Sequence, residues 1–361
     1  MRTTVWTGQA TAELVAGFGA LTNSYYSGEP INDRRVVEWR HLDNPLGSST
    51  AVELVDGDVH VGRMWIQHQG WSVGSAHVTA ANPIDFLILE DHRKLPQFLS
   101  LFKSTMKTAH EAADFVIHSS NPVTDDLYRK LMKYEPCTEL DGGVVPIQPF
   151  AALGAMGRSS LGPLGRLADA LARMSWRVAG RLSRWTGVRL VDAPPSADVQ
   201  DELIARHTAE NEICGVRSAE YRAWRYRSVG PIQYQTQWIM VRGTPRGYVV
   251  FWDRDVDGVR GRFVIDFVCP GSHAGGIARR VWASLAASAS RQGRHGVFFF
   301  YNHANSRLRS ISTFPLVTVG RERLPQRIPV FIRPSESLQR RVVGPLDWSA
   351  GYYTLADFDM F

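Results

Sequence analysis

The sequence predicts an α/β protein built from two tandem domains with mixed central sheets, which an amphipathic helix joins. Two short markers occur twice in the same order: Trp39-Arg40 returns as Trp224-Arg225, and Ile84-Asp85-Phe86 returns as Ile265-Asp266-Phe267. In both copies a polar turn and a glycine-containing strand lie between the markers, and a helix, a short apolar strand and an Asn-containing loop follow them. A separation of roughly 180 residues is far too long for a solenoid repeat, so it indicates two sibling domains.

The predicted domain limits follow this repeat. Residues 1–150 are expected to form the first domain, 151–198 the connecting helix and linker, and 199–361 the second domain. A chain of 361 residues is long for one core and natural for two. We see neither an apolar leader nor an apolar window as long as a transmembrane helix, so we expect a cytoplasmic protein.

Composition argues against several other classes of protein. The net charge of +6 comes almost wholly from arginine, and no basic run is interleaved with aromatic residues, so nucleic-acid binding is not expected. Three scattered cysteines provide neither a disulfide framework nor a zinc site. No nucleophile elbow, Walker loop or dinucleotide fingerprint occurs, and His303 lacks neighbours at metal-ligand spacing. We therefore expect no metal cofactor.

In the first half, periodicity predicts the order of the elements. A hairpin is predicted where Asp56-Gly57 divides two apolar runs, and residues 83–90 are apolar enough to form a central strand. Residues 95–106 place apolar side chains at helical spacing, which predicts a helix packed on that sheet. The full predicted order is helix 11–22, helix 36–41, hairpin 51–65, strands 76–79 and 83–90, helix 95–106, strand 114–118, helix 125–132 and a closing strand 143–147.

The second half repeats this order. A helix over 199–212 precedes a hairpin, residues 262–269 form the central strand, and a helix over 276–291 leads to a strand over 297–301. Hairpins give antiparallel neighbours and strand–helix–strand units give parallel ones, so each half is expected to contain a mixed sheet.

The connector contains a long amphipathic helix, for which two interpretations are open. The helix packs its apolar face on the domains and leaves its arginines in solvent, or it makes a peripheral contact with an anionic membrane through residues 164–185, because basic residues and tryptophan both favour that interface. The apolar positions, at spacings of three and four, are Leu164, Leu167, Leu171, Met174, Val178, Leu182 and Trp185; the arginines are Arg173, Arg177, Arg181 and Arg184.

The element order and two local motifs resemble the GNAT acyltransferase superfamily. One motif is the strand–loop–helix over 83–106, and the other is Asn121 followed by a helix that carries Tyr128. The layout, with Glu38 to Gly47 early and Thr354 to Asp359 at the end, is similar to tandem GNAT proteins of bacterial polysaccharide and cell-surface biosynthesis. The resemblance covers nearly the whole chain, and it implies an N-acyltransferase that uses acetyl-CoA or another acyl-CoA.

The resemblance also implies where an acyl-CoA would bind. In this fold two parallel strands separate so that their backbone groups pair with the pantetheine arm, and the pyrophosphate lies on the N-terminus of the next helix. The first loop lacks the glycines common in the family and contains Pro96, whereas the second half keeps the glycines but has no tyrosine after Asn305. The implied cofactor-binding residues are Leu89, Glu90, His92, Arg93, Lys94, Leu95 and Asn121 in the first half, and Gly275, Gly276 and Ala278 in the second.

Transfer to an amine requires that the ammonium group lose a proton and that the departing thiolate gain one. The resemblance implies Tyr128 as the acid; the alternative is a tyrosine of the core. Asp85 and His118 lie on neighbouring predicted strands and are candidates for the base, directly or through water. The alternative for Asp85 is a structural role shared with Asp266. We expect the duplicated Trp-Arg pairs to be packing residues between the domains.

The sequence therefore predicts an acyl-CoA-dependent N-acyltransferase that acts on an amine. The polysaccharide relatives imply an amino sugar, nucleotide- or lipid-linked, as the acceptor. The first half is expected to carry the chemistry while the second completes the acceptor cleft; the reverse arrangement, as in mycothiol-synthase-like proteins, is the alternative. Two further hypotheses are a Fem-like aminoacyl transferase and a non-catalytic binding or scaffold protein, which would not bind acetyl-CoA saturably.

Overall fold

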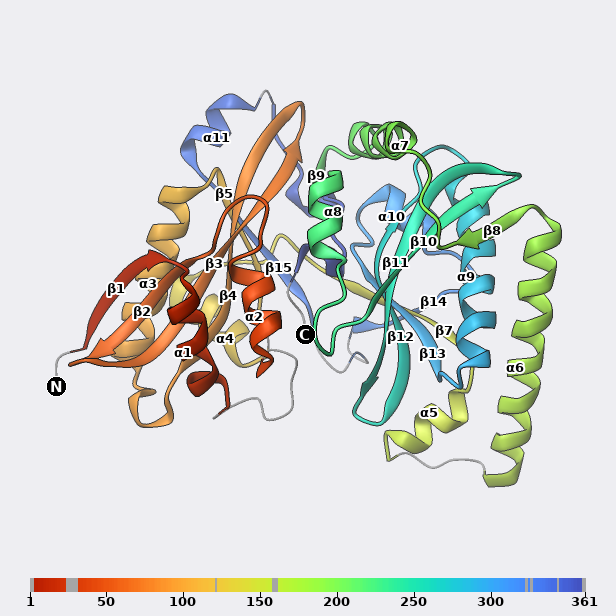
Figure 1. The fold of residues 1–361 in the computed structure, drawn as a ribbon, viewed down its shortest axis with the longest axis horizontal. Helices are drawn as coiled ribbons and strands as arrows, with labels where there is room; N and C mark the ends of the chain where they lie inside the picture. The colour runs from red at the N-terminus through yellow and green to blue at the C-terminus, as the bar shows by residue number, and fades with distance from the viewer. Residues whose placement is uncertain are drawn as a thin grey trace.

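Two mixed β-sheets lie side by side, each with helices packed on it, as the computed structural model of the chain shows (Figure 1). The structure describes residues 3–23, 32–120, 122–157, 162–321, 324, 327–342 and 344–358. The predicted fold class, α/β with two tandem mixed sheets joined by an amphipathic helix, is confirmed.

The first sheet has the strand order β1-β2-β3-β4-β5-β15-β6, and β9 pairs with the C-terminal end of β3. The two strands predicted over 76–79 and 83–90 are one continuous strand, β4. The strands are β1 Thr4–Gln9, β2 Thr50–Asp56, β3 Val59–Val73, β4 Ala76–Ile88, β5 Phe115–Ser119, β6 Thr138–Glu139, β9 Ile213–Gly215 and β15 Pro329–Pro334. The helices of this half are α1 Ala12–Asn23, α2 Arg34–His41, η2 Glu90–His92, α3 Leu95–Ala112, α4 Pro122–Met132 and α11 Glu336–Arg341.

The second sheet has the strand order β14-β7-β13-β12-β11-β10-β8. Its strands are β7 Asp141–Pro146, β8 Val188–Val191, β10 Tyr234–Val241, β11 Thr244–Val256, β12 Val259–Val268, β13 Gly296–Tyr301 and β14 Val317–Val319. The helices around it are α5 Pro149–Ala155, α6 Gly162–Trp185, α7 Ala197–Ala209, α8 Ala219–Arg225, α9 Ala274–Arg291, α10 Ser306–Ile311, η4 Trp348–Ala350 and η5 Leu355–Asp357.

The halves exchange strands: the first half contributes β7 to the second sheet, and the second half contributes β15 and the short β9 to the first. β7 lies between β13 and β14 of the second sheet, where Val144 pairs with Phe298 and with Val317. β15, from near the C-terminus, pairs with β5 of the first sheet, and Phe331 lies opposite His118. The prediction that residues 143–147 close the first sheet is therefore wrong. An alternating apolar strand satisfies either sheet, and only the path of the chain decides which one it enters.

The duplication is visible in equivalent contacts of the two halves. His41, directly after Trp39-Arg40, contacts the carboxylate of Asp85 through Nε2 at 3.2 Å. Tyr226, directly after Trp224-Arg225, donates its hydroxyl to the carboxylate of Asp266 at 2.5 Å. In each half the residue that follows the first marker therefore holds the aspartate of the second. The largest apolar cluster combines buried residues of both sheets, so the halves share a core.

Helix α6 lies at the outer edge of the second half, along α9 (Figure 1). Its small and polar residues face the protein: a Cβ at Gly180 would lie 2.4 Å from that of Ala287, and Trp176 donates its indole N–H to the carbonyl of Pro146 at 2.7 Å. Asp169 accepts hydrogen bonds from the backbone N–H groups of Phe150 and Ala151 and so caps α5.

The apolar stripe of α6 is exposed to solvent. Leu164, Leu171 and Trp185 are 71%, 54% and 86% exposed, and the other predicted stripe positions are similarly open. The interpretation in which this face packs on the domains is therefore wrong, because small residues on another face of the helix make the close contact with α9. Within the described part of the chain, no helix has both the length and the apolar character needed to cross a bilayer.

Candidate functional site

Strands β4 and β5 run parallel but soon separate. They pair only where Ala80 lies opposite Phe115 and Ala81 opposite Val116. β4 then continues to Ile88 and β5 to Ser119 without further pairing between them. We call this separation, between residues 82–88 and 117–119, the first splay. Backbone groups that face a splay are available to an extended ligand, since they have no partner across the sheet.

Buried polar atoms without partners lie at the first splay. Neither ring nitrogen of His118, which is 2% exposed, has a hydrogen-bond partner among the described residues. Nδ2 of Asn82, the first residue of β4 beyond the last pair, also lacks a partner in the described part of the chain, but strand alternation places it on the opposite face of the sheet from His118. Oε1 of Gln97, in the first turn of α3 next to this end of β4, lacks one there as well. Such atoms cost about 1–3 kcal/mol each when nothing bonds to them, so they mark a place where a ligand gains hydrogen bonds.

The structure brings His118 and Tyr128 together. Their ring centroids are 4.6 Å apart, and the His118 ring stacks on Phe331 of β15 with an interplanar angle of 9°. Phe102 of α3 meets the Tyr128 ring edge-on at 4.9 Å. Burial lowers the pKa of His118 to about 3, so the imidazole is neutral at physiological pH. Burial also raises the pKa of Tyr128 above its ordinary value, so the phenol keeps its proton.

Asp85 lies elsewhere in the site, at an irregularity of β4. The register between β3 and β4 shifts beside it, and its backbone has a φ of +53°. Arg40 of α2 donates to both carboxylate oxygens, at 3.1 and 3.3 Å, and His41 contacts one of them. Burial alone would raise the pKa of Asp85, but the charge of Arg40 and the hydrogen bond of His41 outweigh it and lower the pKa. A carboxylate held in this way is a weak proton acceptor.

The predicted phosphate-binding stretch of the first half forms the connection from β4 to α3. Glu90 and His92 lie in the short helix η2, and Leu89 precedes it. Lys94 is the N-cap of α3 and its side chain makes no capping hydrogen bond, while Leu95 is 53% exposed at the first helical position. Arg93 donates to the carbonyl of Ile88 at 3.1 Å. Asn121 lies outside the described residues. The N-terminus of α3 is thus solvent-accessible and has no side-chain cap.

In the second half the chain itself fills the equivalent separation. β12 and β13 pair in parallel from Gly261 opposite Gly296 to Val264 opposite Phe299, and beyond this they form the second splay. The C-terminal segment 348–358 enters it. Thr354 bridges to Tyr301, the N–H of Asn302 donates to the carbonyl of Tyr353, and the Tyr352 hydroxyl donates to the carbonyl of Phe267. Backbone groups at this splay are therefore already bonded.

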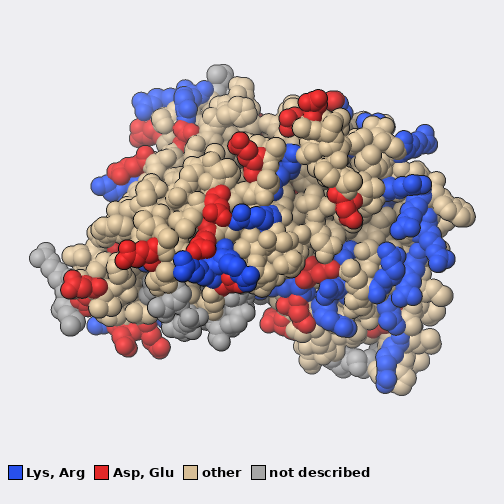
Figure 2. Space-filling view, in the orientation of Figure 1, with Lys and Arg blue, Asp and Glu red and all other residues tan. Residues whose placement is uncertain are grey.

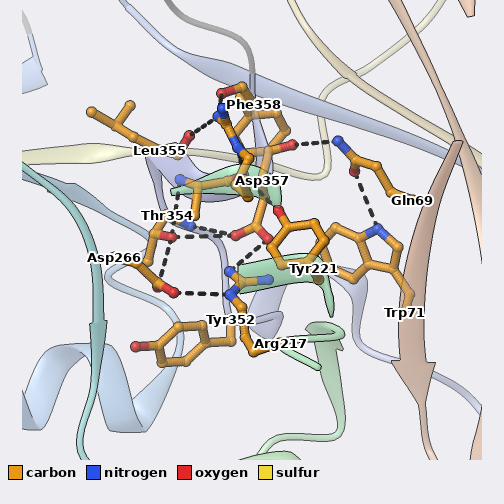
Figure 3. Close-up of polar contacts among 12 residues, drawn as sticks. Gln69, Trp71, Arg217, Tyr221, Asp266, Tyr352, Thr354, Leu355, Asp357 and Phe358 are labelled. Atoms are coloured by element: carbon orange, nitrogen blue, oxygen red, sulfur yellow. Dashed lines mark hydrogen bonds and ion pairs between the residues drawn. The ribbon is translucent and has the colours of Figure 1, made fainter. Parts of the chain in front are cut away.

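A buried ion cluster fixes this segment in place (Figure 3). Arg217 forms ion pairs with Asp266 of β12 at 2.9 Å and with Asp357 of η5 at 2.7 Å. Burial would raise the pKa of Asp266, but Arg217 and the Tyr226 hydroxyl outweigh it and lower the pKa. Burial raises the pKa of Asp357, and Arg217 only partly offsets the effect because the charge of Asp266 adds to it. Gln69 of the first half donates to the backbone carbonyl of Asp357 at 3.2 Å, so the segment touches both halves.

The glycine loop of the second half carries an internal carboxylate. The N–H of Gly271 donates to both oxygens of Glu210, at 2.9 and 3.0 Å, and Arg307 lies 3.4 Å from the same group. Gly275 is required by packing, because a Cβ there would lie 2.7 Å from the carbonyl oxygen of Ser310. Ala278 is fully buried in the core, whereas Gly276 faces open space. An acidic side chain thus bonds to a backbone amide of this loop.

Comparison with solved structures identifies the architecture. A GCN5-related N-acetyltransferase of Anabaena variabilis matches with a TM-score of 0.59 at 13% sequence identity, covering 92% of this chain and 73% of that one. An Enterococcus faecalis protein described as a probable N-acyltransferase gives 0.59 at 11%, with 92% and 73% covered. The N-myristoyltransferase of Saccharomyces cerevisiae, with bound myristoyl-CoA and inhibitors, gives 0.61 at 10%, with 99% and 86% covered. The fold is that of the GNAT acyltransferases.

The GNAT fold is shown by structure alone. No protein-family model matches the sequence, and no curated protein matches it either. The elements expected of the GNAT fold are nevertheless present in both halves: a bulged strand, its separation from a parallel neighbour, and a helix that begins at the end of the bulged strand.

Several residues of the site escaped the sequence analysis. Arg217 and Glu210 have no marker in the sequence, because each acts on a partner far along the chain. His41 and Tyr226 could have been found, since each directly follows a duplicated Trp-Arg pair. Asp357 belongs to the C-terminal motif of the sequence analysis, but its ion pair with Arg217 at the second splay depends on where the C-terminal segment packs, which the local sequence does not show.

Proposed function

We propose that the protein is an acyl-CoA-dependent N-acyltransferase whose acyl-CoA binds in the first splay. One observation carries this proposal: at the first splay the His118 ring is buried with no hydrogen-bond partner in the described part of the chain, whereas the segment 348–358 occupies the second splay. The pantetheine arm would run between β4 and β5, where backbone groups are not paired across the strands. The pyrophosphate would lie on the N-terminus of α3, where the Lys94 side chain makes no capping hydrogen bond and the helix dipole attracts anions, although Pro96 supplies no N–H there.

The first half contains a suitable proton donor for the reaction. An amine nitrogen attacks the thioester carbonyl carbon, the C–N bond forms, the C–S bond breaks, and the nitrogen gives up one proton. Tyr128 remains protonated because of its burial, and we assign to it the proton that the departing thiolate receives; the proton that the nitrogen gives up then returns to Tyr128 through water.

His118 and Asp85 take different roles in this proposal. Neither ring nitrogen of the neutral His118 is bonded by any residue that the structure describes, so we assign it a hydrogen bond to the bound thioester or amine rather than the function of a strong base. Asp85 is already bonded by Arg40 and His41, so we assign it the positioning of α2 against the bulged strand. The incoming amine then loses its proton through water.

A pair of matched substitutions tests where the cofactor binds. Leu95→Glu places a carboxylate on the N-terminus of α3, where it suits the helix dipole but repels a pyrophosphate. Gly276→Glu places a carboxylate in the first turn of α9 in the second half, where a Cβ at this position lies in open space. We expect calorimetric titration with acetyl-CoA, and with longer acyl-CoAs, to show binding that Leu95→Glu weakens at least about tenfold and Gly276→Glu leaves unchanged.

Other outcomes would redirect the proposal. Loss of binding in Gly276→Glu alone would move the cofactor to the second half, as in the mycothiol-synthase-like arrangement. No binding of any acyl-CoA to the unmodified protein would contradict the enzyme proposal and favour the non-catalytic binding protein. Amino-sugar acceptors, which the sequence layout predicts, are the first to assay with whichever acyl-CoA binds.

A further inference from the structure

Half of the large hydrophobic side chains that are exposed in the described structure lie on one helix. Of fourteen such residues, seven belong to α6 and recur at spacings of three and four. They are Leu164, Leu167, Leu171, Met174, Val178, Leu182 and Trp185. At 3.6 residues per turn this stripe lies roughly opposite the buried Gly165, Gly180 and Ser183, so it points directly away from the protein. A contiguous apolar stripe of this kind marks an interaction surface.

A row of arginines flanks the stripe on the side of α9. Arg177, Arg181 and Arg184 of α6, together with Arg291 of α9, line a groove of about 620 Å³ between the two helices. None of these four has an ion-pair partner among the residues that the structure describes. Figure 2 shows the resulting concentration of basic side chains over α6. The groove is suited to phosphate groups, which guanidinium binds in bidentate fashion.

The charge pattern argues against a second copy of the chain as the partner. Asp169 is the only carboxylate of α6, and it is buried on the N-terminus of α5. Two copies that met through this face would therefore bring arginines together with no acidic residue of α6 to pair them. An anionic surface with an apolar interior complements both features of the helix, since it offers phosphates to the groove and hydrocarbon to the stripe.

We propose that α6 docks the protein on an anionic lipid bilayer, with the stripe in the interfacial region and the arginine groove on lipid phosphates. The helix lies flat, because its opposite face is fixed to α9 through Gly180 and Ser290. Trp185, 86% exposed at the C-terminal end, is free to enter the interfacial region that indole rings favour. The second half thus faces the membrane, while the first half, with its splay, lies farther from it (Figure 1).

Flotation with lipid vesicles tests this proposal on the full chain. We expect binding to vesicles of phosphatidylcholine mixed with phosphatidylglycerol, little binding to phosphatidylcholine alone, and release as salt increases. Arg177→Gln/Arg181→Gln should reduce the partition coefficient roughly thirtyfold, since each basic residue near an anionic surface contributes about fivefold. Leu171→Glu/Val178→Glu should abolish binding.

Two control variants separate the surface from general effects of charge and polarity. Arg206→Gln/Arg340→Gln removes two positive charges, as Arg177→Gln/Arg181→Gln does, but from α7 and α11. Val59→Glu replaces an apolar residue of the first half that is about as exposed as Leu171 and Val178. Both should bind as the unmodified protein does, and thermal unfolding should be the same for all variants. Equal binding to neutral and anionic vesicles would overturn the proposal. A different result would also overturn it: the unmodified protein does not bind vesicles but is a dimer by light scattering, and the Leu171→Glu/Val178→Glu variant is a monomer.

Discussion

Trp39 and Trp224 donate their indole N–H groups to each other's backbone carbonyl oxygens, at 2.7 and 2.8 Å. The two residues are the equivalent positions of the duplicated Trp-Arg marker, and their rings lie 5.9 Å apart. The pair therefore lies where the two halves meet, and each half supplies both a donor and an acceptor. This confirms that the duplicated tryptophans are packing residues between the domains.

Removing either indole N–H should destabilise the protein to a similar extent. Trp39→Phe leaves the carbonyl of Trp224 buried without its donor, and Trp224→Phe does the reverse. We expect each to lower the free energy of unfolding by about 1–3 kcal/mol, the cost of an unsatisfied buried group. Trp6→Phe, at a residue 44% exposed, is the control and should have an effect within about 0.5 kcal/mol. Thermal denaturation of the three variants measures these changes. The interpretation would be contradicted if Trp39→Phe and Trp224→Phe lowered the free energy of unfolding no more than the control does.

The exchanged strands should make the halves interdependent. A chain cut between residues 157 and 162 leaves β7 with the first fragment and β15 with the second. We expect the fragments to be insoluble alone, because β5 and β13 each lose a neighbour, and to form a stable complex when co-expressed. Size-exclusion chromatography of the co-expressed pair measures this. A monomeric, folded first fragment would contradict it.

Loss of the Tyr128 hydroxyl should affect turnover rather than binding. Tyr128→Phe keeps the ring that packs on His118 and Phe102 but removes the proposed proton donor. We expect kcat to fall roughly 10²–10⁴-fold, the usual contribution of a general acid, with the Kd for acyl-CoA unchanged. Tyr134→Phe, in the same cluster, is the matched control and should retain activity. An equal loss in both variants would indicate a packing role for Tyr128.

His118 should make the protein less stable in acid. Its pKa is about 3 in the folded protein against 6.5 in the unfolded chain, so the unfolded chain binds the extra proton between these values. The resulting loss of unfolding free energy is absent above pH 6.5 and grows as the pH falls toward about 3. His118→Phe should flatten the dependence of the unfolding free energy on pH in this window by up to about 1.4 kcal/mol per pH unit. Denaturant unfolding at several pH values measures it, and an unchanged slope would show that His118 is not buried as a neutral group.

The sequence reveals the duplication and the order of elements because both depend on local pattern. Periodicity locates α6 and β12 within a few residues, and it finds the start of α3, although that helix continues to Ala112 instead of ending at residue 106. It does not show which face of α6 meets the protein, since Gly180 and Ser183 make the contact while the apolar residues remain outside. It does not show that β7 leaves the first half, because strand pairing is decided by tertiary contacts. Tertiary contacts also decide which predicted catalytic residues lie together. The rings of His118 and Tyr128 are in contact, whereas Asp85 is bonded by Arg40 of α2.

The exchange of strands also affects the order in which the protein is completed during synthesis. Domains near the N-terminus usually fold while the rest of the chain is still being made. Here β5 ends at Ser119 and its neighbour β15 begins at Pro329, so roughly 200 residues leave the ribosome before the first sheet acquires that strand. Until then β5 is a free edge, open to pairing with other nascent chains. Of the two sheets, the one whose strands are made first is thus the one that receives its last strand last, since β14 of the second sheet precedes β15 in the chain.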